Sequence, residues 1–512
     1  MCFLGICVII ISGKRCSYTC SRDFQNLRPL QKIKMKKKVM LILPPNVTVI
    51  PPFSTAEKRH QPMLLGFPLG LGYIASYILR QGKYDVCILD ANKDELTIPA
   101  ILDEIKKYNP SFVGITMYTV NSKVTVELAR QIKLNLKNIV VVAGGPHASD
   151  DYYSLLTRYP FFDYVVIGEG EVTFSELLDA VELKDTTHLS SIKGLAYPDN
   201  AGQVIYTGAR ELHNAIDDFP APARQLIDFN QYISKDNLLP YAIEIMGSRG
   251  CTHRCAFCSF QKKWRPRRTM EIIREMKDLI RTYPQTRSFL FFDDNFSANK
   301  QRVMELCQTI IAEGLRSYMW SCLCRADQVD EEMIRAMKSA GCTKIMFGLE
   351  TADPGILKNL HKKISLTQVK EVVETAAHHG IDALTFFIIG NPGETPATVK
   401  TSYNFAKKLK CHSTMWNIMQ VYPGTALSRL QPCDDFVGYL YEPEVQQPCN
   451  VISANIMAFV NPELNREQLK KMYHKVFRDI VLYKAITHPL FTLKKFFRTP
   501  SWAIRFLTSL FR

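Results

Sequence analysis

The sequence lacks the features that mark several large classes of protein. No apolar stretch is long enough to span a bilayer, and no charged segment precedes the apolar residues 1–12, so we expect neither a membrane span nor a secretory signal. There is no internal repeat and no low-complexity segment, which excludes solenoids and compositionally biased chains. The 15 cysteines do not indicate a disulfide scaffold, because 46% apolar content supplies ample material for a core.

What remains is the composition of a folded, basic protein with several domains. A length of 512 residues favours two or three domains, and 22% charged residues are ordinary for a folded chain. The formal net charge of +15 predicts a basic surface with affinity for anionic small molecules. Nucleic acid is not expected as a partner, because the basic run with an aromatic residue at 262–268 is short. Cysteines that are mostly scattered singly fit a reducing compartment, so we expect a cytoplasmic location.

The two ends of the chain differ from the rest. The first predicted strand begins near Met35, so we expect residues 1–34 to be a non-native or disordered extension. Residues 441–512 form a predicted helical C-terminal region that is basic and rich in Phe towards its end. A terminal helix packed on the preceding domain is the favoured interpretation. A helix lying on a membrane surface, with peripheral membrane association, is the alternative.

Residues 35–185 carry the pattern of a first α/β domain. Short apolar runs rich in β-branched residues lie at 39–43, 86–90, 112–116, 139–143 and 164–167. Helical patterns separate them at 69–80, 98–108, 123–136 and near 149–157. This alternation predicts a parallel, doubly wound, Rossmann-like sheet, whose ligands bind at the carboxyl ends of the strands. Glycines at those ends would let the backbone approach a ligand closely.

A second alternating series follows an irregular, turn-rich stretch at 186–240, which we predict to be a linker. Its predicted strands lie at 242–246, 288–292, 319–324, 344–349, 383–389 and 414–421. Its predicted helices lie near 270–282, 300–313, 331–339, 366–379 and 396–409. Six β/α units predict a partial barrel over residues 241–440, with its chemistry at the carboxyl ends of the strands.

Three closely spaced cysteines directly follow the first strand of this barrel. Cys251, Cys255 and Cys258 have the spacing CxxxCxxC, which places three thiolates on one loop. Such ligands can hold three irons of a four-iron cluster and leave the fourth iron open to a substrate or cofactor. A structural zinc ion needs a fourth ligand, and the next cysteine, Cys307, is about fifty residues away. A disulfide cannot use three partners, and the polar residues 252–254 do not suit a core.

At this loop the sequence resembles the radical S-adenosylmethionine superfamily. The signature of that superfamily has an aromatic residue before the last cysteine, and Phe257 fills this position. The resemblance implies that the open iron chelates the amino and carboxylate groups of S-adenosylmethionine. An electron from the cluster then cleaves the sulfonium to give methionine and a 5′-deoxyadenosyl radical. The resemblance also implies a reducing partner such as flavodoxin or ferredoxin.

Further positions at the strand ends resemble cofactor-binding elements of the superfamily. Asp293 stands where relatives hold the amino group of the cofactor with Gly-Gly-Glu, and Glu350 resembles the acid after the fourth strand. Gly390 opens a segment similar to the glycine-rich element beside the adenine. For the two acids, a charge at a helix N-terminus is the alternative. Arg325 is a candidate donor to the cofactor carboxylate, and an ion pair with Asp327 is equally open.

The first domain resembles the cobalamin-binding domain that precedes the radical barrel in the class B methyltransferase-like branch, most closely at 142–147 and 166–171. The Asp-x-His-x-x-Gly motif, whose histidine ligates cobalt in better-known cobalamin domains, is absent, as in many relatives. The predicted cofactor-binding positions are Gly144, Gly145, His147, Gly168, Glu169 and Gly170. For His147, a hydrogen bond to the nucleotide tail or to the backbone is favoured over cobalt ligation. A sheet without a ligand, or one that binds another nucleotide, is the alternative.

Together these resemblances predict a cobalamin-dependent radical methyltransferase that acts on an unactivated carbon of a small-molecule or lipid-like substrate. No side chain is assigned as a catalytic acid, base or nucleophile. One alternative is an enzyme with both cofactors that performs an oxidative cyclisation or rearrangement without methyl transfer. Another, from a different class, is a non-catalytic metal-binding protein.

Overall fold

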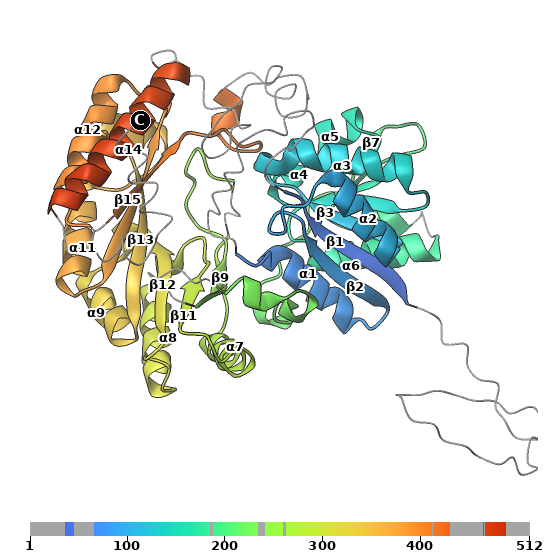
Figure 1. The fold of residues 1–512 in the computed structure, drawn as a ribbon, viewed down its shortest axis with the longest axis horizontal. Coiled ribbons are helices and arrows are strands. Elements are labelled where there is room, and N and C mark those ends of the chain that lie inside the picture. The colour runs from blue at the N-terminus through green and yellow to red at the C-terminus, as the bar shows by residue number, and fades with distance from the viewer. Residues whose placement is uncertain are drawn as a thin grey trace, which may run out of the picture. The chain divides into compact units, whose positions relative to one another are not determined.

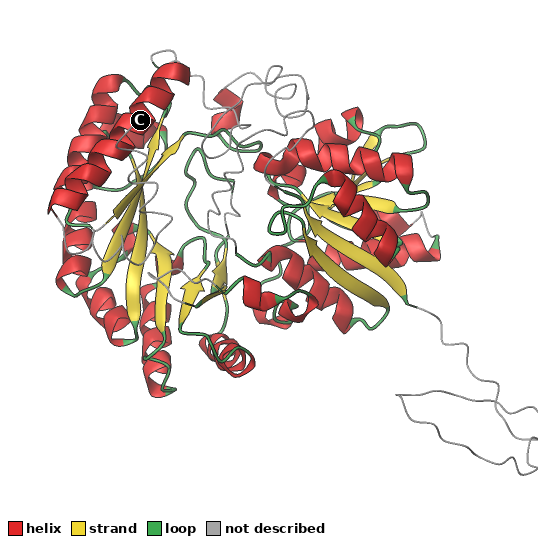
Figure 2. Cartoon of the chain, in the orientation of Figure 1, coloured by secondary structure: helices red, strands yellow, loops and turns green. Residues whose placement is uncertain are grey.

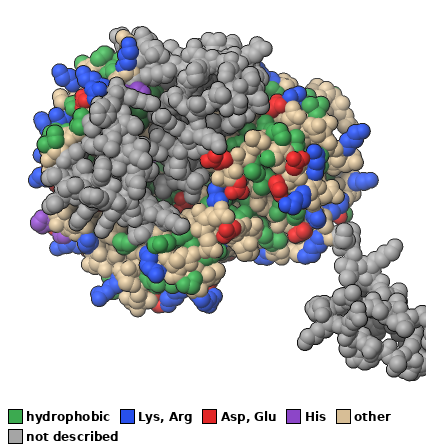
Figure 3. All heavy atoms as spheres, viewed as in Figure 1, with side chains coloured by type: hydrophobic (Ala, Val, Ile, Leu, Met, Phe, Trp, Pro, Cys, Tyr) green, Lys and Arg blue, Asp and Glu red, His purple; other side chains and the backbone are tan. Residues whose placement is uncertain are grey.

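The computed structural model describes residues 36–45, 66–184, 188–233, 241–259, 263–411, 413–430, 464 and 466–487. Within them the chain forms two large sheets, each flanked by helices (Figures 1 and 2). The predicted extension at 1–34 lies outside the described residues. No helix in the described part is long and apolar enough to cross a membrane. Lys and Arg side chains are spread over the face that Figure 3 shows.

The first sheet has seven strands in the order β2-β1-β3-β4-β5-β6-β7. The strands are β1 (Lys37–Leu43), β2 (Tyr84–Asp90), β3 (Phe112–Thr116), β4 (Val140–Gly144), β5 (Tyr164–Val166), β6 (Leu195–Pro198) and β7 (Val204–Tyr206). The first five pair in parallel, which confirms the predicted doubly wound sheet. The last two pair antiparallel and come from residues that we expected to be irregular.

Helices cover both faces of this sheet. They are α1 (Leu69–Arg80), α2 (Ile98–Tyr108), α3 (Ser122–Asn135), α4 (Pro146–Asp150), α5 (Tyr152–Arg158) and α6 (Gly170–Leu183). In β1, Val39 and Leu41 belong to the core that includes α1 and α6. Met40 and Ile42 belong to the opposite core, which includes α2 and α3. A parallel strand buried on both faces explains why residues 39–43 are continuously apolar in sequence.

The second sheet has six parallel strands in the order β15-β14-β13-β12-β11-β8. The strands are β8 (Ala242–Ile245), β11 (Ser288–Phe291), β12 (Met319–Cys324), β13 (Cys342–Glu350), β14 (Asp382–Ile389) and β15 (Ser413–Ile418). The helices are α7 (Thr269–Thr282), α8 (Lys300–Ala312), α9 (Glu331–Ser339), α10 (Pro354–Asn359), α11 (Leu366–His378), α12 (Pro396–Lys408) and α14 (Arg466–Thr487). This arrangement confirms the predicted six-unit partial barrel.

The C-terminal helix α14 packs against α12 and β15. Its buried side chains include Leu469, Tyr473, Val476 and Ile480, whose spacing of three and four residues places them on one helix face. Over residues 466–487, the prediction of a terminal helix packed on the barrel is therefore confirmed. The basic and aromatic residues 488–512 lie outside the described part of the chain.

Candidate cluster and cofactor site

A short antiparallel pair of strands frames the cysteine loop. The strands are β9 (Ser248–Arg249) and β10 (Arg265–Pro266), and the three cysteines lie between them. The loop begins at Gly250, whose φ of 81° lies in the left-handed region that glycine tolerates. Cys251, Cys255 and Cys258 are half-buried and form no disulfide bond.

The middle of the cysteine loop is held by two other segments of the barrel. The backbone N–H of Ala256 donates to the carbonyl oxygen of Leu360, after α10, at 2.9 Å. The carbonyl oxygen of Ala256 accepts from the N–H of Leu427, after β15, at 2.9 Å. Phe257, the predicted signature aromatic, packs on the hydrophobic cluster that contains Leu360 and Leu427. The middle of the loop, at Ala256 and Phe257, is thus held by contacts with other segments of the chain.

Two aspartates at the end of β11 hold the entrance of this loop. Asp293 accepts the Gly247 N–H at 2.6 Å through Oδ1 and the Ser248 hydroxyl at 2.5 Å through Oδ2. Asp294 accepts the Gly250 N–H at 2.7 Å. Burial raises the pKa of Asp293 above its ordinary value. Both oxygens of Asp293 are engaged by the chain itself, and the predicted contact of this residue with the cofactor stays a prediction.

Arg325 lies between an acid, Asp327, and Cys255, one of the predicted cluster ligands. Its Nε and Nη2 each donate to Asp327 at 3.0 Å, so the ion pair left open by the sequence is present. Its Nη1 lies 3.9 Å from the Sγ of Cys255. A guanidinium at this position is a cation that stabilises negative charge on neighbouring groups. The arrangement therefore combines a structural pair with a cation next to a predicted iron ligand.

Sequence reasoning did not single out His253, which lies between the first two cysteines. Its Nε2 is buried and has no hydrogen-bond partner among the described residues. Burial, followed by the charge of Arg325, lowers the pKa of His253 below its usual value. An unsatisfied buried nitrogen in a loop of three thiols is a signal for a bound group that only the structure provides.

These residues fit an iron–sulfur cluster. Three thiols that form no disulfide bond lie on one loop, with a guanidinium and an unsatisfied imidazole nitrogen beside them. Within the described ranges, no group of three or more His, Cys, Asp or Glu side chains is arranged to hold a single metal ion. A four-iron cluster does not need three side chains that converge on one ion, because each thiolate binds a different iron.

Glu350, at the end of β13, forms a buried ion pair. Its φ is 70°, and the register with β14 shifts at this point. Its Oε1 accepts from Lys362 Nζ at 2.5 Å, and both side chains are buried. The following helices are capped by Asn299 and Asp353, so neither Asp293 nor Glu350 is the helix-capping residue. Contact of Glu350 with the cofactor stays a prediction.

The loop after β14 is held by hydrogen bonds from its backbone to the carboxylate of Glu394, which lies in the same loop. The N–H groups of Gly390 and Asn391 donate to Glu394 Oε2 at 2.5 and 3.1 Å. Burial raises the pKa of Glu394 to about 7. A Cβ at Gly390, whose φ is 90°, would lie 3.2 Å from Leu469 of α14. The positive φ and this close contact both favour glycine here, and its predicted place beside the adenine stays a prediction.

The glycines at the ends of β4 and β5 serve different purposes. At Gly145, with φ of 93°, a Cβ would lie 2.8 Å from Thr116 Oγ1, so packing excludes a side chain. At Gly170 a Cβ would lie 2.9 Å from Ile74 Cδ1, which is too close. At Gly144 the nearest atom to a Cβ would be the Val166 carbonyl oxygen, at an ordinary contact distance of 3.7 Å. At Gly168, with φ of 82°, it would meet nothing within 4 Å. Of these four positions, Gly168 alone presents bare backbone to open space, which suits close approach of a ligand.

His147 is buried inside the first domain. Its Nδ1 lies 3.0 Å from the hydroxyl of Thr119, and its backbone N–H donates to Met117 at 3.1 Å. Burial lowers the pKa of His147 to about 3, so the ring is neutral at ordinary pH. The ring thus makes its hydrogen bond to a threonine side chain, whereas the favoured partner was the nucleotide tail or the backbone. Its role toward a cofactor stays a prediction.

The acids at the end of β5 pair with the strands that frame the cysteine loop. Glu169 pairs with Arg265 at 2.5 Å and with Arg249 at 3.4 Å, and Glu171 pairs with Arg249 at 2.7 Å. Glu169 was predicted to contact the cofactor, which stays a prediction, and neither arginine was predicted as a site residue. Their position immediately before and after the cysteine loop was the available signal.

Comparison with known proteins gives two family matches. The Radical SAM superfamily model matches residues 245–406, and the B12 binding domain model matches residues 63–178. The chain is 37% identical over 394 residues to an uncharacterized methyltransferase of Pyrococcus horikoshii, covering 76% of this chain and 83% of that protein. It is 26% identical over 365 residues to the anaerobic magnesium-protoporphyrin IX monomethyl ester cyclase of Rubrivivax gelatinosus, covering 70% and 64%, respectively.

Two solved structures share the fold. The cobalamin-dependent S-adenosylmethionine radical enzyme OxsB matches with a TM-score of 0.60 at 20% identity, over 75% of this chain and 53% of OxsB. The chain therefore spans about half the length of OxsB. The radical S-adenosylmethionine methyltransferase TsrM of Kitasatospora setae matches with a TM-score of 0.60 at 19% identity, over 77% of both chains.

Proposed function

Because this chain belongs to the cobalamin-binding branch of the radical S-adenosylmethionine superfamily, we propose that it methylates an unactivated carbon of a small-molecule substrate. Membership of this branch brings three cofactors, namely a four-iron four-sulfur cluster, S-adenosylmethionine and cobalamin. Enzymes of the superfamily draw electrons from an external reductant. A flavodoxin or ferredoxin in that role, and a cytoplasmic location, are part of the same proposal.

The observation that carries the proposal is the direct link between the two cofactor regions. Glu169, at the end of β5, pairs with Arg265 and Arg249 of the strands that frame the cysteine loop. Methylation of a substrate radical requires that the methyl donor and the source of the radical both reach the same bound substrate. A contact between these two regions supports such a shared position.

When bound, the cluster supplies the electron that cleaves S-adenosylmethionine, and cobalamin supplies the transferable methyl group. In the proposal, Cys251, Cys255 and Cys258 hold three irons of the cluster. Arg325, 3.9 Å from the Cys255 sulfur, offsets part of the negative charge of the thiolates.

The other proposed site residues bind and orient the cofactors. Glu350, whose Oε1 accepts from Lys362 Nζ at 2.5 Å, is the proposed acceptor for donors of S-adenosylmethionine. Gly168 is the proposed point of close approach for cobalamin, because a Cβ at this position would have no atom within 4 Å. The remaining proposed cofactor positions are Phe257, Asp293, Gly390, Gly144, Gly145, His147 and Gly170.

The relatives favour methyl transfer over cyclisation. The methyltransferase relative is 37% identical and the cyclase relative 26% identical, and the methyltransferase match covers the larger share of both chains. Cyclisation without methyl transfer is the second candidate, and it rests on the cyclase relatives.

The test uses full-length protein reconstituted anaerobically with iron, sulfide and hydroxocobalamin. Reduced protein is given S-adenosylmethionine that carries a deuterated methyl group, and both 5′-deoxyadenosine and labelled methylcobalamin are measured. We expect both products from the wild type and neither 5′-deoxyadenosine nor a cluster signal from Cys255→Ala. The matched control is Cys87→Ala, which removes a half-buried free thiol of β2.

Each outcome separates two of the candidate functions. Formation of 5′-deoxyadenosine without methylcobalamin would move the assignment to cyclisation or rearrangement. Absence of both products from protein that carries its cluster would leave a non-catalytic metal-binding protein.

A further inference from the structure

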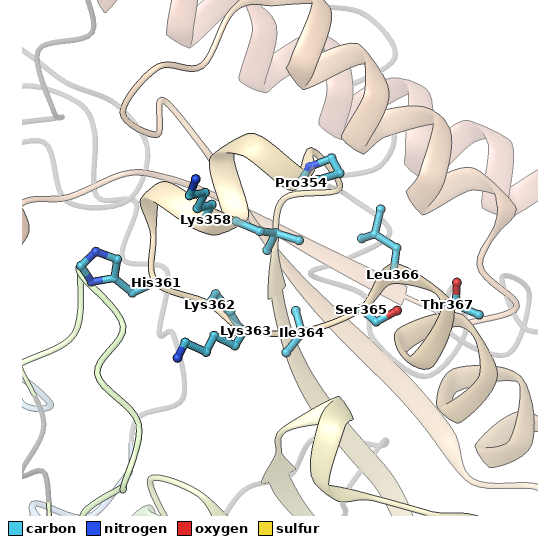
Figure 4. A pocket seen from close by; sticks show the side chains of 10 residues that line it. Pro354, Lys358, His361, Lys362, Lys363, Ile364, Ser365, Leu366 and Thr367 are labelled. Carbon is cyan, nitrogen blue, oxygen red and sulfur yellow. The ribbon is translucent and has the colours of Figure 1, made fainter.

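A cavity of about 640 Å³ lies on the barrel and is lined by one segment of the chain. The lining runs from Pro354, at the start of α10, to Thr367, in the first turn of α11 (Figure 4). None of its lining residues was singled out in the sequence. The cavity therefore needs an explanation separate from the predicted cofactor positions.

The cavity lies beside the cysteine loop. The segment that lines it includes α10, and Leu360, directly after this helix, accepts the N–H of Ala256 at 2.9 Å. Asn359 donates to the Pro392 carbonyl of the loop after β14 at 3.2 Å. These contacts place the cavity at the carboxyl edge of the barrel strands, where barrel enzymes carry out their chemistry. A ligand in the cavity would therefore lie next to the cysteine loop.

The charge of the cavity is positive. Its basic residues are Lys358, His361, Lys362 and Lys363. Lys362 is buried and neutralised by its ion pair with Glu350 at 2.5 Å. The other three are exposed, and in the described part of the chain none of them forms an ion pair. Lysines without acidic partners around a concave surface favour an anion.

The rest of the lining is apolar or carries hydroxyl groups. The basic residues lie at one end of the cavity in Figure 4, and Ser365, Leu366 and Thr367 lie at the other. Leu357 is buried, and Ile364 and Leu366 are half-buried. A cavity with a cationic end and apolar walls matches a molecule with an anionic group on an apolar body.

We propose that this cavity binds the anionic group of the substrate, a phosphate or a carboxylate, while apolar atoms of the substrate lie against Leu357, Ile364 and Leu366. The inference rests on the proposed function and narrows its substrate class. S-adenosylmethionine is a poor occupant, because its sulfonium and ammonium groups outweigh its single carboxylate and basic side chains repel it. The cavity therefore binds a second molecule, which is negatively charged and lies next to the cysteine loop.

The test measures binding of three probes to the anaerobically reconstituted full-length protein by calorimetry. Octyl phosphate and octanoate share an apolar chain and differ in the anionic group, and inorganic phosphate lacks the chain. We expect octyl phosphate to bind more tightly than inorganic phosphate, because the chain adds apolar contact. Comparison with octanoate identifies the preferred anionic group.

The variant for this test is the double substitution Lys358→Met with Lys363→Met. Methionine keeps the length of the side chain and removes the charge. We expect the affinity for octyl phosphate to fall about tenfold or more, since each charge-assisted contact contributes appreciably to binding. The matched control is Lys370→Met, an exposed lysine of α11 outside the cavity, for which we expect unchanged affinity.

The failure of this inference and that of the proposed function are distinguishable. Wild-type protein that forms 5′-deoxyadenosine and yet binds none of the probes overturns the anion site and leaves the proposed function in place. Equal affinity in the double variant and in the wild type also overturns the site. Wild-type protein that binds octyl phosphate with the expected loss in the double variant, but forms no 5′-deoxyadenosine, supports the site and overturns the proposed function.

Discussion

Arg265 donates two hydrogen bonds to the carboxylate of Glu169, from Nη2 to Oε1 at 2.5 Å and from Nη1 to Oε2 at 3.0 Å. The pair joins the end of β5 to a strand that frames the cysteine loop, across 96 positions of sequence. The Arg265 side chain is 3% exposed and that of Glu169 is 21% exposed. A two-point pair this far removed from water is worth more than a surface salt bridge, and loss of one partner leaves a charge in a poorly solvated place.

We therefore predict that Glu169→Gln lowers the free energy of unfolding by about 2–3 kcal/mol, because the Arg265 guanidinium loses its counter-charge. Urea denaturation of the apo-protein measures the change. The control is Glu176→Gln, whose partner Arg210 is 24% exposed while Glu176 itself is 41% exposed. We expect the control to change stability by about 0.5 kcal/mol or less. Equal effects of the two substitutions would contradict a special role for the Glu169 pair.

A second prediction concerns Asp293, which holds Gly247 and Ser248 at the entrance of the cysteine loop. In Asp293→Asn one acceptor becomes an amide donor, so one of the two contacts is lost and the loop is less firmly held. We expect a loss of about 1–3 kcal/mol in stability and a lower iron content after reconstitution. Iron and sulfide analysis and the electron paramagnetic resonance of the reduced cluster measure the second effect.

The control for Asp293 is Asp278→Asn, on the exposed face of α7. Its ion pair with Arg281 is solvated, so we expect full iron content. If Asp293→Asn also bound its full complement of iron, the two contacts would be dispensable for the cysteine loop.

A third prediction is a pH dependence set by His147. Burial lowers the pKa of His147 to about 3 in the folded protein, whereas the unfolded chain takes up a proton near pH 6.5. Below that pH the unfolded state binds more protons than the folded state, so the stability contributed by neutral His147 is present above pH 6.5 and is lost as the pH falls. Between pH 6.5 and 5.5 the loss is about 1 kcal/mol.

The variant that tests this dependence is His147→Asn, which removes the titrating ring. We expect a lower stability at pH 7 and a shallower decline between pH 6.5 and 4 than in the wild type, measured by urea denaturation across the range. Replacement of the exposed His378 by Asn is the control and should leave the slope unchanged. An unchanged slope in His147→Asn would show that other groups govern the acid limb.

The sequence was sufficient where the determining pattern is local. The predicted helix at 69–80 and strand at 112–116 match α1 and β3 residue for residue. Their apolar patterns lie within the segments, and the chain breakers lie close by, with Gly82 just after α1 and Asn109-Pro110 just before β3. The strands β6 and β7, of 4 and 3 residues, are too short to carry a period and exist through pairing with β5 and with each other.

The same distinction applies to the site. The cysteine spacing is local and could be interpreted directly. The partners of Glu169 and Asp293 could not be predicted, because they depend on which strand ends meet in the fold, 96 and 46 positions away in sequence. An acid at a strand end has the same local sequence whether it binds a cofactor or an arginine.

A fourth prediction uses two glycines with nearly the same backbone to separate strain from ligand contact. Gly168 has φ of 82° and Gly202 has φ of 80°, and a Cβ at either position would meet nothing within 4 Å. Alanine therefore strains both positions alike, at a cost of about 1 kcal/mol in stability. Gly168 follows β5 at the predicted cobalamin site, whereas Gly202 lies in the turn between β6 and β7.

Titration of the purified apo-protein with hydroxocobalamin, followed by absorbance, should therefore distinguish the two variants. If the corrin or its nucleotide tail approaches the bare backbone at Gly168, the added methyl group occupies part of its space, and we expect Gly168→Ala to weaken cobalamin binding about tenfold. Gly202→Ala should bind as the wild type does, although it is destabilised to a similar extent. Equal affinities in the two variants would mean that cobalamin does not approach this strand end, and the open side of Gly168 would then need a different occupant.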